Sequence, residues 1–145
     1  MSSPALAVQK ALRARLVAAS AVTALVPAAH IVDRHQLPVL DPSIVLGEDQ
    51  EVDPEFQTLR RGMVRVYSTL HLWKREPGLV GVKQIAGAIR KTIETGLKLN
   101  LDDPDFHAID ARVSEVRFLR DPDGETAHGI VTLDSILSKT WAMTP

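Results

Sequence analysis

The chain has 145 residues, enough for one domain with a buried core, and the composition of an ordinary soluble protein. Hydrophobic residues make up 45% and charged residues 24%. The formal net charge of -1 excludes a strong electrostatic attraction of the whole molecule to nucleic acid or to an anionic membrane. Because cysteine is absent, disulfides and thiolate metal sites are excluded. No signal-peptide pattern or membrane-spanning apolar run is found, so we expect a cytoplasmic product with no membrane partner.

The first part of the chain predicts a helix, a short strand and a loop. Ser3-Pro4 provides a capping hydroxyl followed by a proline, which is typical of a helix start. Apolar residues then recur at helical spacing over residues 5–19, and a second short turn is expected over 21–26. A strand over 31–34 and a proline-containing loop over 36–42 follow.

The next segment predicts two strands with an acidic loop between them. Residues 43–48 form an apolar run that suits a buried strand, and the loop is expected over 48–55. Residues 63–74 alternate strictly, which predicts a strand with one core face and one amphipathic face. The core face consists of Val64, Val66, Ser68, Leu70 and Leu72. The other face, directed at water or a neighbouring subunit, consists of Met63, Arg65, Tyr67, Thr69, His71 and Trp73.

The last part predicts a helix and a long hairpin. One apolar stripe marks a helix over 79–95, with Gly96 as its expected cap. A strand starting near Ile109 changes phase near Ser114, which indicates a β-bulge. Asp121-Pro122-Asp123-Gly124 is a strong turn signal, and the returning strand is expected over 126–136. The tail over 138–145 shows neither helical nor strand periodicity.

These elements predict an α+β fold: a two-layer sandwich with a largely antiparallel sheet of about five strands and two main helices on one face. We expect a single domain over residues 1–137 and a C-terminal extension over 138–145. Within that extension, Trp141 either frays with the terminus or anchors on an adjacent subunit.

The sequence contains no signature of an enzyme. It lacks a nucleophile elbow and a phosphate-binding loop, and its five histidines do not follow the spacing of a metal site. We therefore predict no catalytic residue, metal or cofactor. Asp33 and His35 lie on one side of an extended segment, so a small enzyme that uses Asp33, His35 or His71 stays open as an alternative from another class.

Charged residues give little support for nucleic-acid binding. The basic doublets are Arg60-Arg61 and Lys74-Arg75, and Trp73 is the aromatic residue that could stack on a base beside them. Acidic residues crowd the loop before the long strand and are either plain solvated groups or the lining of a channel that repels passing DNA. They are Glu48, Asp49, Glu51, Asp53 and Glu55.

The hairpin Arg117 to Ile130 closely resembles the end of a family of tail-completion proteins found in long-tailed phages, prophages and gene transfer agents. The resemblance continues in order through most of the chain, over residues 6–16, 23–26, 31–34, 42–48, 70–75 and 82–86. Two departures are Ser43, at a position where an aromatic residue is common, and a tail after Leu137 that is longer than usual.

The resemblance implies a tail terminator: a structural ring, usually a hexamer, that caps the tail tube and joins it to the head-closure complex. Its partners would be copies of itself, the tail tube protein and a head-closure or adaptor protein, with DNA only passing through the lumen. It would be assembled in the bacterial cytoplasm and reside in the virion or particle. The neighbouring head-closure (stopper) ring subunit is an alternative within the same class.

A rigid hairpin suits a docking element, so we expect it at a ring interface. The residues predicted to contact a subunit or partner are Arg117, Arg120, Asp121, Asp123, His128, Trp73 and Trp141.

Overall fold

A computed structural model describes residues 3–34, 37–54, 62–95 and 98–143 of the chain. Its elements in chain order are α1 (Pro4–Ala18), α2 (Ser20–Thr23), the 3-10 turn η1 (Ala28–His30), β1 (Ile31–Val32), β2 (Ser43–Val52), β3 (Met63–Arg75), α3 (Val80–Glu94), β4 (Phe106–Arg120), β5 (Thr126–Lys139) and the 3-10 turn η2 (Thr140–Met143).

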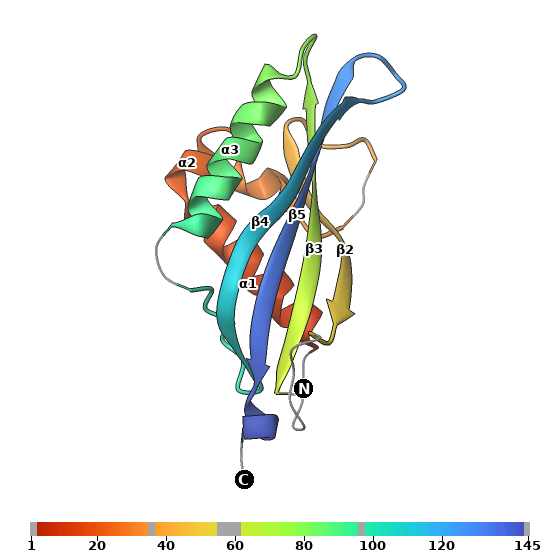
Figure 1. The fold of residues 1–145 in the computed structure, drawn as a ribbon. Coiled ribbons are helices and arrows are strands. Elements are labelled where there is room, and N and C mark those ends of the chain that lie inside the picture. Colours follow the sequence, from red (N-terminus) through yellow and green to blue (C-terminus); the bar gives the residue numbers. More distant parts are fainter. Residues whose placement is uncertain (1–2, 35–36, 55–61, 96–97, 144–145) are drawn as a thin grey trace.

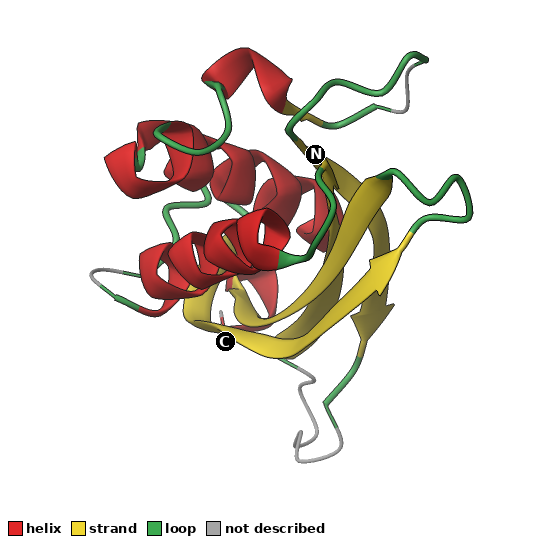
Figure 2. Cartoon of the chain, turned by 90° about the horizontal axis from the view of Figure 1, so that it is seen from above, coloured by secondary structure: helices red, strands yellow, loops and turns green. Residues whose placement is uncertain are grey.

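The five strands form one sheet in the order β1-β2-β3-β5-β4. The short β1 runs parallel to β2, and all other neighbours are antiparallel. All three α-helices cover the same face of the sheet (Figures 1 and 2). The predicted α+β fold with a largely antiparallel sheet is therefore confirmed, and the short α2 adds a third helix to the two main ones.

The hydrophobic core lies between the helices and the covered face of the sheet. Helix α1 begins where the sequence predicts, because the Ser3 hydroxyl accepts a hydrogen bond from the Leu6 N–H at 3.0 Å and proline follows. The burial of β3 alternates as predicted, with Val64, Val66, Ser68, Leu70 and Leu72 buried. The core side chains of the two long helices include Val8, Leu12, Leu16, Ile85 and Ile89, all at most 1% exposed.

The predicted acidic loop is wrong for its first half, because β2 continues to Val52. Its register against β3 shifts between Leu46 and Asp49, after which Asp49–Val52 pair with Arg65–Ser68. A β-bulge absorbs Gly47 and Glu48 without ending the strand. The run of acidic residues shows no alternation of apolar and polar side chains, so its sequence indicates a loop although its backbone pairs as a strand. Gly96 lies outside the described residues.

The hairpin β4–β5 forms as predicted, but both of its strands are longer than expected. Strand β4 begins at Phe106 and β5 continues to Lys139, and Trp141 lies in η2, so the tail up to Met143 has regular structure. The bulge near Ser114 is confirmed by a register shift between Val113 and Glu115. A second shift, between Ala108 and Asp110, was not predicted, and Ile109 at this shift is 39% exposed.

The hairpin turn has the geometry that its sequence predicts. The Asp121 N–H donates to the Thr126 carbonyl at 2.9 Å, and the Gly124 N–H donates to the Asp121 carbonyl at 3.0 Å. Gly124 has a φ of 74°, a conformation that glycine adopts without strain. This turn fixes the register of the two longest neighbouring strands.

Strand β4 forms one edge of the sheet, and helix α3 protects it. The Val113 N–H, at the bulge, donates to the Glu94 carboxylate of α3 at 3.1 Å, so it is not available for pairing with another chain. Glu94 also lies 3.5 Å from Arg90 in an ion pair along the helix.

We expect Glu94→Ala to lower the free energy of unfolding by about 1 kcal/mol, because the Val113 N–H loses its acceptor. Urea unfolding followed by circular dichroism measures this loss, and light scattering measures any added self-association through the edge. Arg90→Ala is the matched control, since it removes the ion pair and leaves the acceptor. Equal losses in the two variants would contradict the role given to Glu94.

Candidate functional site

A stack of three rings lies on the uncovered face of the sheet, near its hairpin end. Trp73 of β3 is directly opposite His128 of β5, and their ring centroids are 3.8 Å apart with an interplanar angle of 9°. His71 lies two residues before Trp73, on the same face, and its ring is 5.1 Å from that of His128. The strand pairing alone therefore brings these rings together.

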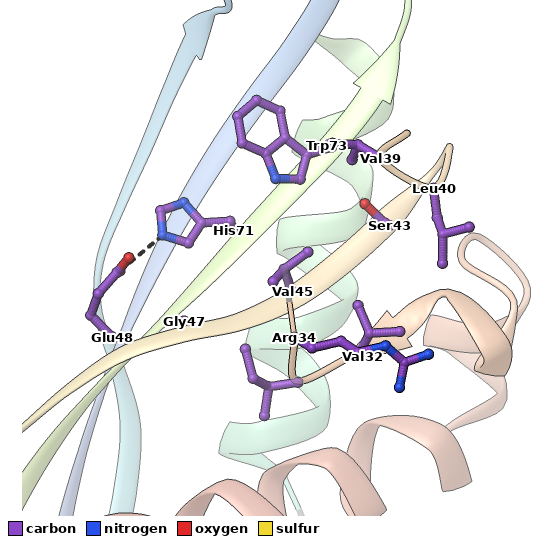
Figure 3. Close-up of a pocket in the computed structure, with 11 residues that line it drawn as sticks. Val32, Arg34, Val39, Leu40, Ser43, Val45, Gly47, Glu48, His71 and Trp73 are labelled. Atoms are coloured by element: carbon purple, nitrogen blue, oxygen red, sulfur yellow. Dashed lines mark hydrogen bonds and ion pairs between the residues drawn. The ribbon is translucent and has the colours of Figure 1, made fainter. Parts of the chain in front are cut away.

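Polar contacts link the two histidines to β2. The Nδ1 atom of His71 lies 2.9 Å from Nε2 of His128, so one nitrogen donates and the other accepts. The Nε2 atom of His71 lies 3.0 Å from the Glu48 carboxylate (Figure 3). A Cβ on Gly47 would lie 2.8 Å from the His71 ring, so this position of the ring requires glycine.

These contacts set the charge of the stack. Burial, reinforced by His71 nearby, lowers the pKa of His128 despite the opposing charge of Asp121. The hydrogen bond from His71 lowers the pKa of Glu48. At neutral pH His128 is therefore an uncharged ring that packs against Trp73.

The turn between β3 and α3 holds the hairpin in place. Both terminal nitrogens of the Arg120 guanidinium donate to backbone carbonyls of this turn, one to Gly78 at 2.8 Å and the other to Glu76. The Glu76 carboxylate in turn accepts the N–H groups of Gly81 and Val82, at 2.8 and 3.0 Å. A carboxylate at these positions satisfies amides at the start of α3 and complements its dipole. Hairpin, turn and helix are thus connected.

Contacts with β3 and within the turn hold the hairpin tip. The Arg75 guanidinium pairs with the Glu125 carboxylate of the tip at 2.6 Å. The backbone N–H of Arg75 donates to the Asp41 carboxylate at 3.0 Å. The Asp123 carboxylate accepts the N–H of Glu125 and both the N–H and the hydroxyl of Thr126. Those hydrogen bonds lower the pKa of Asp123. The tip is therefore bonded to its own turn and to the end of β3, which is in turn bonded to the loop before β2.

The structure brings most of the predicted interface residues to one end of the sheet. Trp73 and His128 stack, and Arg120, Asp121 and Asp123 lie at the tip, where Arg120 bonds its own chain. Arg117 is exposed on β4. Trp141 lies at the opposite end, edge-on to Phe106 with ring centroids 5.4 Å apart. The sequence analysis missed Glu76. Its position just before the start of the predicted helix is a signal that its carboxylate could accept the first N–H groups of that helix.

The acidic residues predicted to line a lumen do not point to one side of the molecule. Glu48 contacts His71, Glu51 accepts the Ala5 N–H at 3.2 Å, and Asp53 lies 3.7 Å from the Lys139 ammonium. Asp49 is exposed, and Glu55 lies outside the described residues. Alternation along β2 separates them.

The residues proposed for an enzyme or metal site do not assemble into one where the structure describes them. Asp33 is exposed, His71 belongs to the ring stack, and His35 lies outside the described residues. Among the described residues, no group of three or more histidine, aspartate or glutamate side chains could hold a metal ion. Within the same residues, no helix is both long and apolar enough to cross a membrane.

The lowered pKa of His128 makes stability depend on pH. The unfolded chain binds a proton at this histidine near its ordinary pKa of 6.5, whereas the folded chain binds it only at lower pH. The stabilisation is therefore complete above pH 6.5 and is lost as the pH falls through the folded-state pKa. Between pH 7.5 and 5, we expect the stability of His128→Phe to fall less than that of the parent chain, as measured by the urea midpoints of unfolding. His107→Phe is the control, and an unchanged slope in His128→Phe would contradict this account.

Comparisons with known proteins agree with the resemblance of the hairpin. The sequence matches the family described as "Tail completion protein gp17" over residues 10–138. A chain from the solved structure "Virion of native gene transfer agent (GTA) particle" is similar in fold, with a TM-score of 0.78, 17% identity, and coverage of 94% of this chain and 99% of that chain. A search of curated proteins gave no match.

The gp17 protein of bacteriophage SPP1 is also similar in fold, with a TM-score of 0.56, 17% identity, and coverage of 90% of this chain and 88% of that chain. The family match spans most of the chain, from the first helix to the end of the last strand. The chain belongs to the family of tail completion proteins, and is thus a structural component of a phage-like particle, not an enzyme.

Proposed function

We propose that this tail completion protein is the tail terminator, a ring that caps the tail tube and joins it to the head-closure complex. The observation that carries the proposal is the rigid hairpin end, where four contacts hold the β4–β5 tip to the end of β3 and to the β3–α3 turn. Ordering these groups in advance lowers the entropy lost when another protein binds. A docking element benefits from such rigidity.

The uncovered face of the sheet supports a ring of several copies. In the part of the chain that the structure describes, helices cover only the opposite face, and the bare face carries large side chains such as Trp73, Tyr67 and Arg65. A hexamer is the ring size that the family resemblance implies. The hairpin end would lie at an interface of the ring, and residues 138–145 would act as an extension that contacts a neighbouring subunit.

In the proposed ring, DNA passes through the lumen without being bound. Glu48 and Asp49 are exposed acidic residues that would repel phosphate there. Glu51, Asp53 and Glu55 complete the proposed lining, although Glu51 and Asp53 also bond within the chain. The proposed protein partners are the tail tube protein and a head-closure or adaptor protein.

Particles produced without the chain distinguish a terminator from a stopper. We expect overlong or unattached tails in electron micrographs, because a terminator ends tube growth and presents the tube to the head. Reintroducing the chain from a plasmid should restore tails of uniform length. Filled heads that lose their DNA while tails stay normal would overturn the proposal in favour of the head-closure ring.

Trimming the hairpin tests its place at an interface. Deleting Pro122 and Asp123 leaves a four-residue connection between Arg120 and Ala127, a length that hairpins tolerate. We expect the shortened chain to fold, as judged by circular dichroism, but to attach heads to tails at least tenfold less often. Pro122→Ala keeps the length and serves as the control. Undiminished attachment by the folded, trimmed chain would remove the hairpin from the interface.

A further inference from the structure

A pocket of about 290 Å³ lies beside the ring stack, on the β2 side of the sheet (Figure 3). Its walls are largely apolar, and its volume is near the lower limit of about 300 Å³ for pockets that hold small ligands. A space of this size suits one large side chain better than a metabolite. The lining side chains that define it are Val32, Val39, Leu40, Val45, His71 and Trp73.

The pocket contains a polar group without a partner. Ser43 is 0% exposed, and its hydroxyl oxygen makes no hydrogen bond with any residue that the structure describes. Figure 3 shows this hydroxyl on the same side of β2 as Trp73. A buried hydroxyl without a partner costs stability, so a group that enters the pocket with a polar hydrogen would relieve that cost.

The chain itself exposes a side chain with the matching properties. Trp141 is 54% exposed, and its contact with Phe106 is edge-on, so much of the indole stays accessible. Its N–H has no hydrogen-bond acceptor among the described residues. Tryptophan combines a large apolar surface with one donor, and it is favoured at the centres of protein interfaces.

The two features cannot meet within one subunit. Trp73, at the pocket, is near the end of β3, whereas η2 with Trp141 follows the end of β5 that pairs with Met63, at the start of β3. Strand β3 has 13 residues. At roughly 3.3 Å per residue, such a strand spans about 40 Å. The pocket can therefore receive Trp141 only from another copy.

We propose that Trp141 of one subunit inserts into the Ser43 pocket of the next. The proposal rests on the ring proposed above and names one of its contacts. It joins two different surfaces of identical chains, which is the heterologous geometry that rings require. The indole packs among the apolar walls next to Trp73, and its N–H donates to the Ser43 hydroxyl oxygen. Val39, which is 39% exposed at the pocket, is covered by the contact.

Because the natural chain has no cysteine, this contact can be tested by directed cross-linking in assembled particles. Val39→Cys and Ala142→Cys, which leaves the Trp141 indole in place, are made singly and together, and purified particles are treated with a short bismaleimide. We expect the double variant to give a ladder of covalent oligomers and each single variant to remain monomeric on denaturing gels. A link within one subunit is ruled out by the separation of the two sites.

The outcome also separates this inference from the terminator proposal. Particles that contain the double variant at the head–tail junction but show no ladder would overturn the Trp141 contact and leave the terminator proposal intact. Particles in which the parent chain is absent from that junction would overturn both. A partner that is not a second copy, such as the tube protein, would appear as a cross-linked band of a different mass in one single variant, and that result also overturns the contact.

Filling the pocket provides a second measurement that does not alter Trp141. Val45→Phe places a ring in the space, whereas Val52→Phe makes the same change on the same face of β2, away from the pocket. We expect Val45→Phe to lower the amount of the chain in particles at least fivefold and Val52→Phe to change it less than twofold. Both variants are first checked for folding by circular dichroism. Normal incorporation of folded Val45→Phe would contradict the proposal.

Discussion

The uninterrupted pairing of β3 with β5 is the constraint on which the rest of the structure depends. Every residue from Met63 to Arg75 has a partner between Thr126 and Ser138, with no shift of register. Because side chains alternate, this one register decides which residues enter the core and which meet on the bare face. It places Trp73 against His128, and it sets the hairpin tip beside the end of β3, where Arg75 reaches Glu125. A slip by one residue would exchange the two faces.

The strands on either side of the β3–β5 pair contain bulges. Register shifts interrupt β2 once and β4 twice, all on strands that lie outside the β3–β5 pair. Bulges bend a strand and increase its twist, so the flanks can follow helices that cover one face only. They also make β4 a poor template for unwanted pairing, together with the contact from Glu94.

The sequence predicted the parts of the fold that repeat and missed those that depend on distant contacts. The alternation of β3, the apolar stripe of α3 and the Asp121–Gly124 turn are local signals, and the structure confirms them. The extension of β2 to Val52 was missed because its charged residues pair through their backbone, which no side-chain pattern reports. The site was predicted in part: Trp73 and His128 were identified singly, but their stacking follows from register. Arg120 is among the residues predicted to contact a partner, yet distant carbonyls of the β3–α3 turn bind it.

The proposed contact between subunits restricts how the sheet is oriented in a ring. Rotation about the ring axis maps each copy onto the next without changing height along that axis. Trp141 and the pocket that receives it must therefore lie at the same height within one subunit. Since they occupy opposite ends of the sheet, its strands must run closer to the circumference of the ring than to its axis. The hairpin tip, at the pocket end, then points toward the neighbouring subunit, and its rigid attachment through Arg120 and Arg75 would fix the angle between copies and so the number of copies that closes the ring.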